Sequence, residues 1–127
     1  MSRYFSVDEA NDALLTISPL MDAIQAIRRD ILARRPEVWP VIEKAAGNGG
    51  SKAASRMAVN FEQLDKLVHQ IQDMGVILKD INTGLLDFPA LRDGTEVYLC
   101  WRFGEGYIAF WHEIDAGFSG RQPIDTF

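Results

Sequence analysis

Side chains that could do chemistry gather in the last third of the chain, between residues 97 and 123. This stretch holds His112, one of two histidines, close to the carboxylates Glu113 and Asp115, and it holds the single cysteine, Cys100. Histidine combined with carboxylates is a set that both general acid–base catalysis and metal binding use. The same stretch is rich in aromatic residues and glycine, so it indicates where a site would lie without naming a reaction.

A metal centre at His112 would need more ligands than its immediate neighbours supply. In a strand, His112 and Glu113 point to opposite faces, so both cannot bind one ion unless the strand ends there. A transition-metal site usually takes three or four ligands, and the other histidine, His69, falls within a predicted helix. Further side chains could complete a set, although their spacing does not require it: Asp87, Glu105, Glu113, Asp115 and Cys100. We expect no metal or other cofactor, and we expect His112 to form a hydrogen bond at the edge of the core. The alternative is that His112 is a metal ligand.

Cys100 has a functional and a structural interpretation. Cys100 lies in the middle of a predicted strand, and the strand pairing that we draw places it on the face opposite His112. A nucleophilic cysteine needs a nearby base, so we expect Cys100 to be a buried structural thiol. The catalytic candidates, if there is an enzyme here, are His112, Glu113, Asp115 and Asp87.

The loop Gly117-Phe118-Ser119-Gly120-Arg121-Gln122-Pro123 is the best candidate for ligand binding. Its glycines allow a close approach of the backbone to a small anion, and Arg121 adds a planar donor with Arg102 as a second one. The alternative is a structural turn in which Arg121 pairs with Asp115 or Glu113. The predicted ligand-binding residues are Arg121, Gly117, Gly120, Trp111 and Arg102.

The first half of the chain predicts two long helices. Ser6 and Glu9 form a capping box, after which apolar residues recur at intervals of three and four up to Pro36. Pro19 falls inside this pattern and predicts a kink near residues 15–18. A short helical piece interrupted by Pro40 follows over residues 36–46, and a second long helix is expected from Ser51 to Gly75.

After Gly75 the apolar period changes to two, which predicts strands at residues 76–81, 85–88, 96–102 and 107–112. With a bend at Gly104-Glu105, Trp101 pairs with Ile108 and Val97 pairs with His112. The fold class is therefore α+β, with a long antiparallel helical hairpin packed on a small antiparallel β-meander. We expect a single domain over residues 1–127, with the hairpin in residues 1–75 and the meander and C-terminal loop in residues 76–127. The meander is too small to cover the hairpin, so we expect a homodimer.

Composition limits the classes of function. The chain of 127 residues has a net charge of −5, which disfavours binding to nucleic acids. One cysteine cannot form an internal disulfide, and neither an apolar signal segment nor an apolar run near 20 residues occurs, so we expect a cytoplasmic protein that does not enter a membrane.

Three segments resemble a family of small bacterial proteins, the "domain of unknown function 2203". They are residues 4–11, residues 75–94, and the block 97–123 with Trp111-His112-Glu113-x-Asp115-x-Gly117-Phe118-x-Gly120-Arg121-x-Pro123. The resemblance implies no activity, but it favours as the site Asp87, Trp111, His112, Glu113, Gly117, Gly120 and Arg121. Two functions stay open: a homodimeric module that binds a protein partner or a small anion, which we favour, and a metal-dependent or acid–base enzyme centred on His112.

Overall fold

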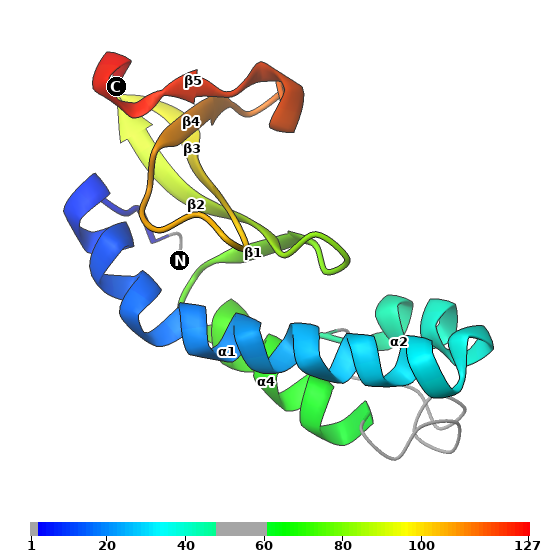
Figure 1. Cartoon of the computed structure of the whole chain (residues 1–127). Helices are drawn as coiled ribbons and strands as arrows, with labels where there is room; N and C mark the ends of the chain where they lie inside the picture. The colour runs from blue at the N-terminus through cyan, green and yellow to red at the C-terminus, as the bar shows by residue number, and fades with distance from the viewer. Residues whose placement is uncertain (1–2, 48–60) are drawn as a thin grey trace.

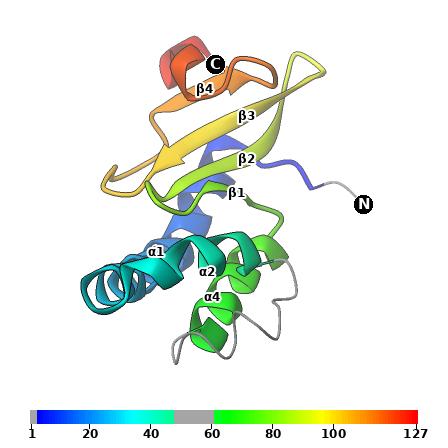
Figure 2. The same ribbon diagram turned by 90° about the vertical axis from the view of Figure 1, so that its right-hand side faces the viewer.

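The computed structural model describes residues 3–47 and 61–127, and it has an α+β architecture in which a curved sheet lies above a layer of helices (Figures 1 and 2). The helical layer contains α1 (Val7–Arg34), a 3-10 helix η1 (Pro36–Val38), α2 (Trp39–Ala45) and α4 (Phe61–Asp73). None of these helices combines the length and the apolar character that a membrane crossing requires.

Helix α1 starts and stops where the sequence predicts. The Ser6 hydroxyl accepts from the Glu9 N–H at 3.0 Å, and the Glu9 carboxylate accepts from the Ser6 N–H at 2.9 Å, which completes the capping box. The helix contains Pro19, and Figure 1 shows it changing direction along its first half. It ends at Arg34, just before Pro36.

The expected hairpin of two long helices is not confirmed. Helix α4 has 13 residues against 28 in α1, and the predicted start at Ser51 lies outside the described residues. Helix α4 packs along α1 and is followed by Gly75 at φ 86°, the left-handed conformation expected of a residue that ends a helix. Pro40 does not interrupt a helix, because α2 begins at Trp39 and places Pro40 in its first turn, where no donor is required.

The sheet is an antiparallel meander of five strands in the order β1-β2-β3-β4-β5. Its strands are β1 (Ile77–Asp80), β2 (Leu85–Arg92), β3 (Thr95–Arg102), β4 (Phe110–Glu113) and β5 (Gln122–Pro123). Two short 3-10 helices, η2 (Phe118–Gly120) and η3 (Ile124–Thr126), flank β5. Strand β2 is longer than predicted, and β4 starts three residues later than predicted.

The predicted register between the third and fourth strands is wrong by one residue. Val97 pairs with Glu113 and Tyr98 pairs with His112, whereas we expected Val97 to pair with His112. Because side chains alternate between the faces of a strand, a slip of one residue moves every side chain to the other face. His112 therefore lies on the face of Cys100, and the expectation that they occupy opposite faces is wrong.

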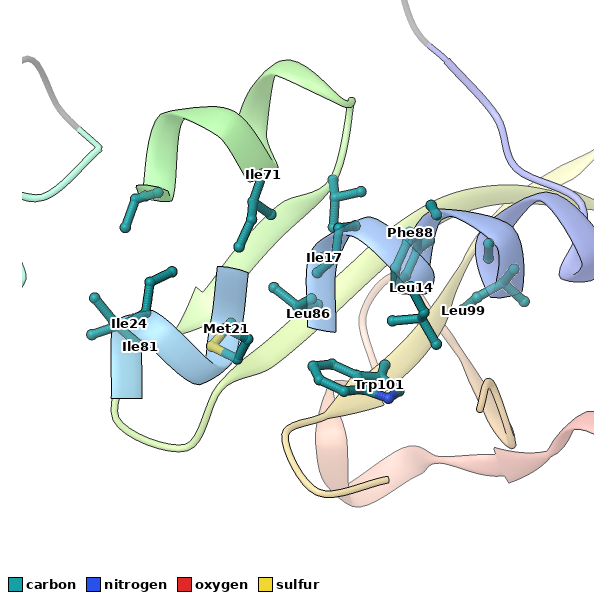
Figure 3. Packing of buried hydrophobic residues seen from close by; sticks show 14 of the residues in the cluster. Leu14, Ile17, Met21, Ile24, Ile71, Ile81, Leu86, Phe88, Leu99 and Trp101 are labelled. Atoms are coloured by element: carbon teal, nitrogen blue, oxygen red, sulfur yellow. The ribbon is translucent and has the colours of Figure 1, made fainter. Parts of the chain in front are cut away.

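The core lies between the helices and the face of the sheet that carries Leu86, Phe88, Leu99 and Trp101 (Figure 3). Helix α1 covers this face with a fully buried row that includes Ile17, Met21 and Ile24. The opposite face, which we call the outer face, carries the polar residues described next.

Candidate functional site

Three neighbouring strands bring Asp87, Cys100 and His112 together on the outer face of the sheet. Asp87 on β2 lies directly opposite Cys100 on β3, and Cys100 lies opposite Phe110 on β4, two residues before His112. The three residues are 1%, 0% and 2% exposed. Each offers one potential ligand atom, and these three atoms all lie within 4.8 Å of one another. Polar groups as buried as these require partners, because an unpaired polar group in the interior is costly.

Hydrogen bonds fix the orientation of the His112 ring. Its Nδ1 lies 2.7 Å from the Glu113 carbonyl oxygen, and its Nε2 lies 2.9 Å from Oδ1 of Asp87. A carbonyl oxygen can only accept, so Nδ1 carries a proton and Nε2 faces the carboxylate. Nε2 and Oδ1 must then share a proton, since two lone pairs at that distance would repel each other.

The thiol of Cys100 is held in its protonated form. Burial raises its pKa to about 12 from the ordinary 9.0, the positive charge of Arg121 opposes this shift, and Asp87 and Glu105 add to it. The thiol is hydrogen-bonded to the Asp87 side chain. Cys100 therefore lacks the thiolate character of a nucleophile.

Tyr98 lies beside this cluster, with its ring centroid 5.5 Å from that of His112. Burial raises the pKa of Tyr98, and the carboxylates of Glu96 and Asp87 raise it further. Tyr98 therefore keeps its hydroxyl proton at neutral pH.

Glu113 and Asp115 do not join the cluster. Both are exposed, and Glu113 follows His112 on the strand and points to the other face. Among the described residues, His112 thus has one carboxylate at hydrogen-bonding distance, that of Asp87. Strands β2, β3 and β4 instead bring a carboxylate, a thiol and an imidazole together, with their ligand atoms within 4.8 Å of one another.

The C-terminal loop covers part of the outer face. Arg121 places its guanidinium carbon 4.0 Å from the ring centroid of Phe110 and 4.7 Å from that of Phe118. Its Nη2 donates to both carboxylate oxygens of Glu105, at 2.8 and 2.9 Å, and approaches the Cys100 carbonyl oxygen at 3.4 Å. We expected the positive charge of Arg121 to bind a small anion or to pair with Asp115 or Glu113. Glu105 balances this charge instead.

The other predicted ligand-binding residues are only partly brought together. Gly117 adopts a φ of 64°, and Gly120 has no room for a side chain beside Ala116. Arg102 lies over Phe118 and so shares the outer face with Arg121. Trp111 lies on the core face opposite Leu99, and its indole N–H donates to the Thr126 hydroxyl.

Replacing Glu105 by Gln tests how strongly its carboxylate fastens the C-terminal loop. The side chains of Arg121 and Glu105 are 12% and 23% exposed, so the substitution leaves a largely buried guanidinium without its counter-charge. We expect the free energy of unfolding to fall by about 1–3 kcal/mol, measured by urea denaturation at pH 7. Glu113→Gln, at an exposed carboxylate, is the matched control, and an equal loss in both variants would contradict the fastening role.

Reasoning from the sequence missed two contacts in this region. Glu105 is a candidate metal ligand by its residue type, yet it binds Arg121, 16 positions later. The error in the predicted register placed Cys100 and His112 on opposite faces of the sheet. A turn that is one residue longer places Cys100 and His112 on one face, but this length depends on the contact of Ile108 with Asn11, 97 positions away.

Comparison with curated proteins and comparison with solved structures each gave no match. A family model does match, over residues 3–124. The chain therefore belongs to the family described as "Uncharacterized conserved protein (DUF2203)".

Proposed function

We propose that this protein binds one divalent transition-metal ion through Asp87, Cys100 and His112. The observation that carries the proposal is the approach of a histidine nitrogen, a thiol sulfur and a carboxylate oxygen to within 4.8 Å of one another. Three protein ligands fill three of the four positions of a tetrahedral zinc ion, and a water molecule would fill the fourth.

The fixed histidine ring supports this proposal. Metal-binding histidines commonly donate the proton of one ring nitrogen to a backbone carbonyl, which leaves the other nitrogen to bind the ion. His112 has this arrangement, because Nδ1 bonds to the Glu113 carbonyl and Nε2 faces Asp87. The ring would not have to turn for Nε2 to bind.

Charge balance also favours a divalent ion. A Cys100 thiolate and an Asp87 carboxylate together carry two negative charges, and a neutral His112 adds none. A divalent cation would make the cluster electrically neutral, and neutrality matters because the three side chains are at most 2% exposed. A thiol with an imidazole selects zinc, iron, cobalt or copper over calcium or magnesium.

Burial argues for metal binding rather than for catalysis at this cluster. A catalytic ion must be reached by substrate, whereas Asp87, Cys100 and His112 are buried. The thiol is also protonated in the absence of an ion, because its pKa is raised to about 12. The ion would therefore act as a cross-link between β2, β3 and β4.

Cobalt titration of the chelator-treated protein tests the proposal. We expect one equivalent of Co²⁺ to bind with a thiolate-to-cobalt absorption band, because Cys100 must lose its proton to bind the ion. Cys100→Ser should abolish the band, and His112→Ala should weaken binding by roughly 100-fold or more, since even a change in a ligand's hydrogen-bond partner costs about 10–100-fold.

His69→Ala is the matched control, because His69 is the other histidine and lies on the partly exposed side of α4. This variant should bind Co²⁺ as the unmodified protein does. Absence of the thiolate band in the unmodified protein, or equal losses in the two histidine variants, would reject the site. Cys100→Ser keeps the test valid if His112→Ala does not fold.

The homodimer stays a prediction of its own. Sedimentation equilibrium at micromolar concentration should give twice the mass of one chain, and a mass equal to one chain would contradict it.

A further inference from the structure

A groove separates the first half of α1 from the turn that follows β3. It has a volume of about 320 Å³ and is lined by residues that include Leu14, Leu15, Pro19, Trp101 and Gly106. Figure 3 shows Leu14 and Trp101 next to each other at this end of the core. The turn is fastened to α1 by the Asn11 side chain, whose Oδ1 accepts from the Ile108 N–H at 2.8 Å. The groove therefore has two walls held at a fixed spacing, and neither wall belongs to the cluster of Asp87, Cys100 and His112.

Each of the two elements that form the groove carries an exposed apolar side chain. Leu15 is 79% exposed and Tyr107, which directly follows Gly106, is 65% exposed. These are the two most exposed large apolar side chains among the described residues. Apolar side chains exposed beside a preformed groove are a common feature of surfaces that bind another protein. An occupant that covered both would extend past the cavity, which favours a peptide segment over a small molecule.

The charged residues on the α1 side of the groove have one sign. Residues 7–22 include Asp8, Glu9, Asp12 and Asp22 and contain neither lysine nor arginine. Asp22 lines the groove, is exposed, and makes no ion pair with another described residue. An occupant carrying lysine or arginine would be attracted to this rim, since complementary charge favours association and selects partners.

The polar groups at the groove accept hydrogen bonds. Pro19 has no N–H, so the carbonyl of Leu15 lacks the donor that a helix would normally supply. The carboxylate of Asp22 is a second acceptor, and the hydroxyl of Ser18 can accept as well. Lysine and arginine side chains are donors without acceptors, so they match this set of groups.

We infer that this groove docks a basic, amphipathic peptide segment of a partner protein, with an apolar side chain against Leu15 and Pro19 and a lysine or arginine at Asp22. The segment would contact α1 at its Pro19 turn, where the acceptor groups and the apolar side chains occur together. This inference goes beyond metal binding and does not depend on it.

Selection from a random dodecamer peptide display library against the full-length protein tests the inference. We expect the recovered peptides to combine leucine or an aromatic residue with lysine or arginine. A recovered peptide should bind Leu15→Asp at least roughly 10-fold more weakly and Asp22→Asn about 3–10-fold more weakly, since these correspond to about 1.4 and 0.7–1.4 kcal/mol. Its affinity should also fall as salt is raised, because the rim charges are exposed.

Leu91→Asp is the matched control, because Leu91 is 47% exposed and is not among the residues that line the groove. This variant should bind the peptide as the unmodified protein does. Recovery of no peptide, or of peptides without basic residues, or an affinity unchanged by Leu15→Asp, would overturn the inference. A dimeric mass that Leu15→Asp converts to a monomeric mass would also overturn it, because a second copy would then occupy the groove.

Discussion

Replacing Asp87 by Ala is expected to lower the free energy of unfolding of the metal-free protein by about 3–5 kcal/mol. The substitution removes the partner of His112 Nε2, which lies 2.9 Å from Oδ1 of Asp87 at a site where both side chains are at most 3% exposed. It also removes the partner of the Cys100 thiol. Urea denaturation at pH 7 in the presence of a chelator, followed by the fluorescence of the buried Trp101 and Trp111, measures the loss.

A double variant separates the effect of losing the Asp87–His112 interaction from the effect of losing side-chain volume. His112→Ala alone should also be strongly destabilising, but Asp87→Ala with His112→Ala together should cost less than the sum of the two, because neither partner is then left alone. Glu113→Ala, at the exposed neighbour of His112, should change stability by no more than about 0.5 kcal/mol. A loss below about 1 kcal/mol in Asp87→Ala would mean that the buried pair contributes little.

The parts of this fold that follow from local sequence were predictable. The capping box at Ser6, the end of α1 before Pro36 and the left-handed Gly75 each depend on a few neighbouring residues. The order of the first four strands followed from the same logic, because consecutive strands of an antiparallel meander are neighbours in the sheet, whereas β5 was not predicted.

The register of β3 and β4 was not predictable, because residues far apart in the sequence determine it. The connection spans residues 103–109, and it is held by the Trp101 indole N–H, which donates to the Glu105 carbonyl at 2.8 Å. It is also held by the Asn11 side chain, which is 97 positions from Ile108. Our prediction of a two-residue bend at Gly104-Glu105 does not include this contact with α1. The predicted register is therefore wrong by one residue, and it places Cys100 and His112 on opposite faces.

The residue types at the site were recognisable, but their grouping was not. Asp87, Cys100 and His112 were each considered, and their approach depends on the register of three strands at once. The partner of Arg121 was missed for a similar reason, since Glu105 reaches it only when the C-terminal loop folds back over Phe110.

The metal-free protein should lose stability between about pH 9 and pH 12 because of Cys100. Burial raises the pKa of this thiol to about 12 in the folded protein from 9.0. The folded state therefore keeps a proton that the unfolded chain releases as the pH rises through 9. The contribution of this thiol to the free energy of unfolding is complete below pH 9 and is lost as the pH approaches 12. The difference between a pKa of about 12 and one of 9.0 corresponds to a loss of about 4 kcal/mol in total.

Comparison with Cys100→Ser isolates this contribution, because other groups also titrate in this range and affect both proteins alike. The serine hydroxyl does not titrate below pH 12, and it can still donate to Asp87. Urea denaturation in the presence of a chelator at pH 8, 9.5 and 11 should show the unmodified protein losing stability relative to Cys100→Ser, by roughly 2–3 kcal/mol at pH 11. Parallel pH profiles would mean that the thiol is not desolvated in the fold. A diverging profile would show instead that burial in the sheet keeps the Cys100 thiol neutral, the state from which the proposed metal ion would displace a proton.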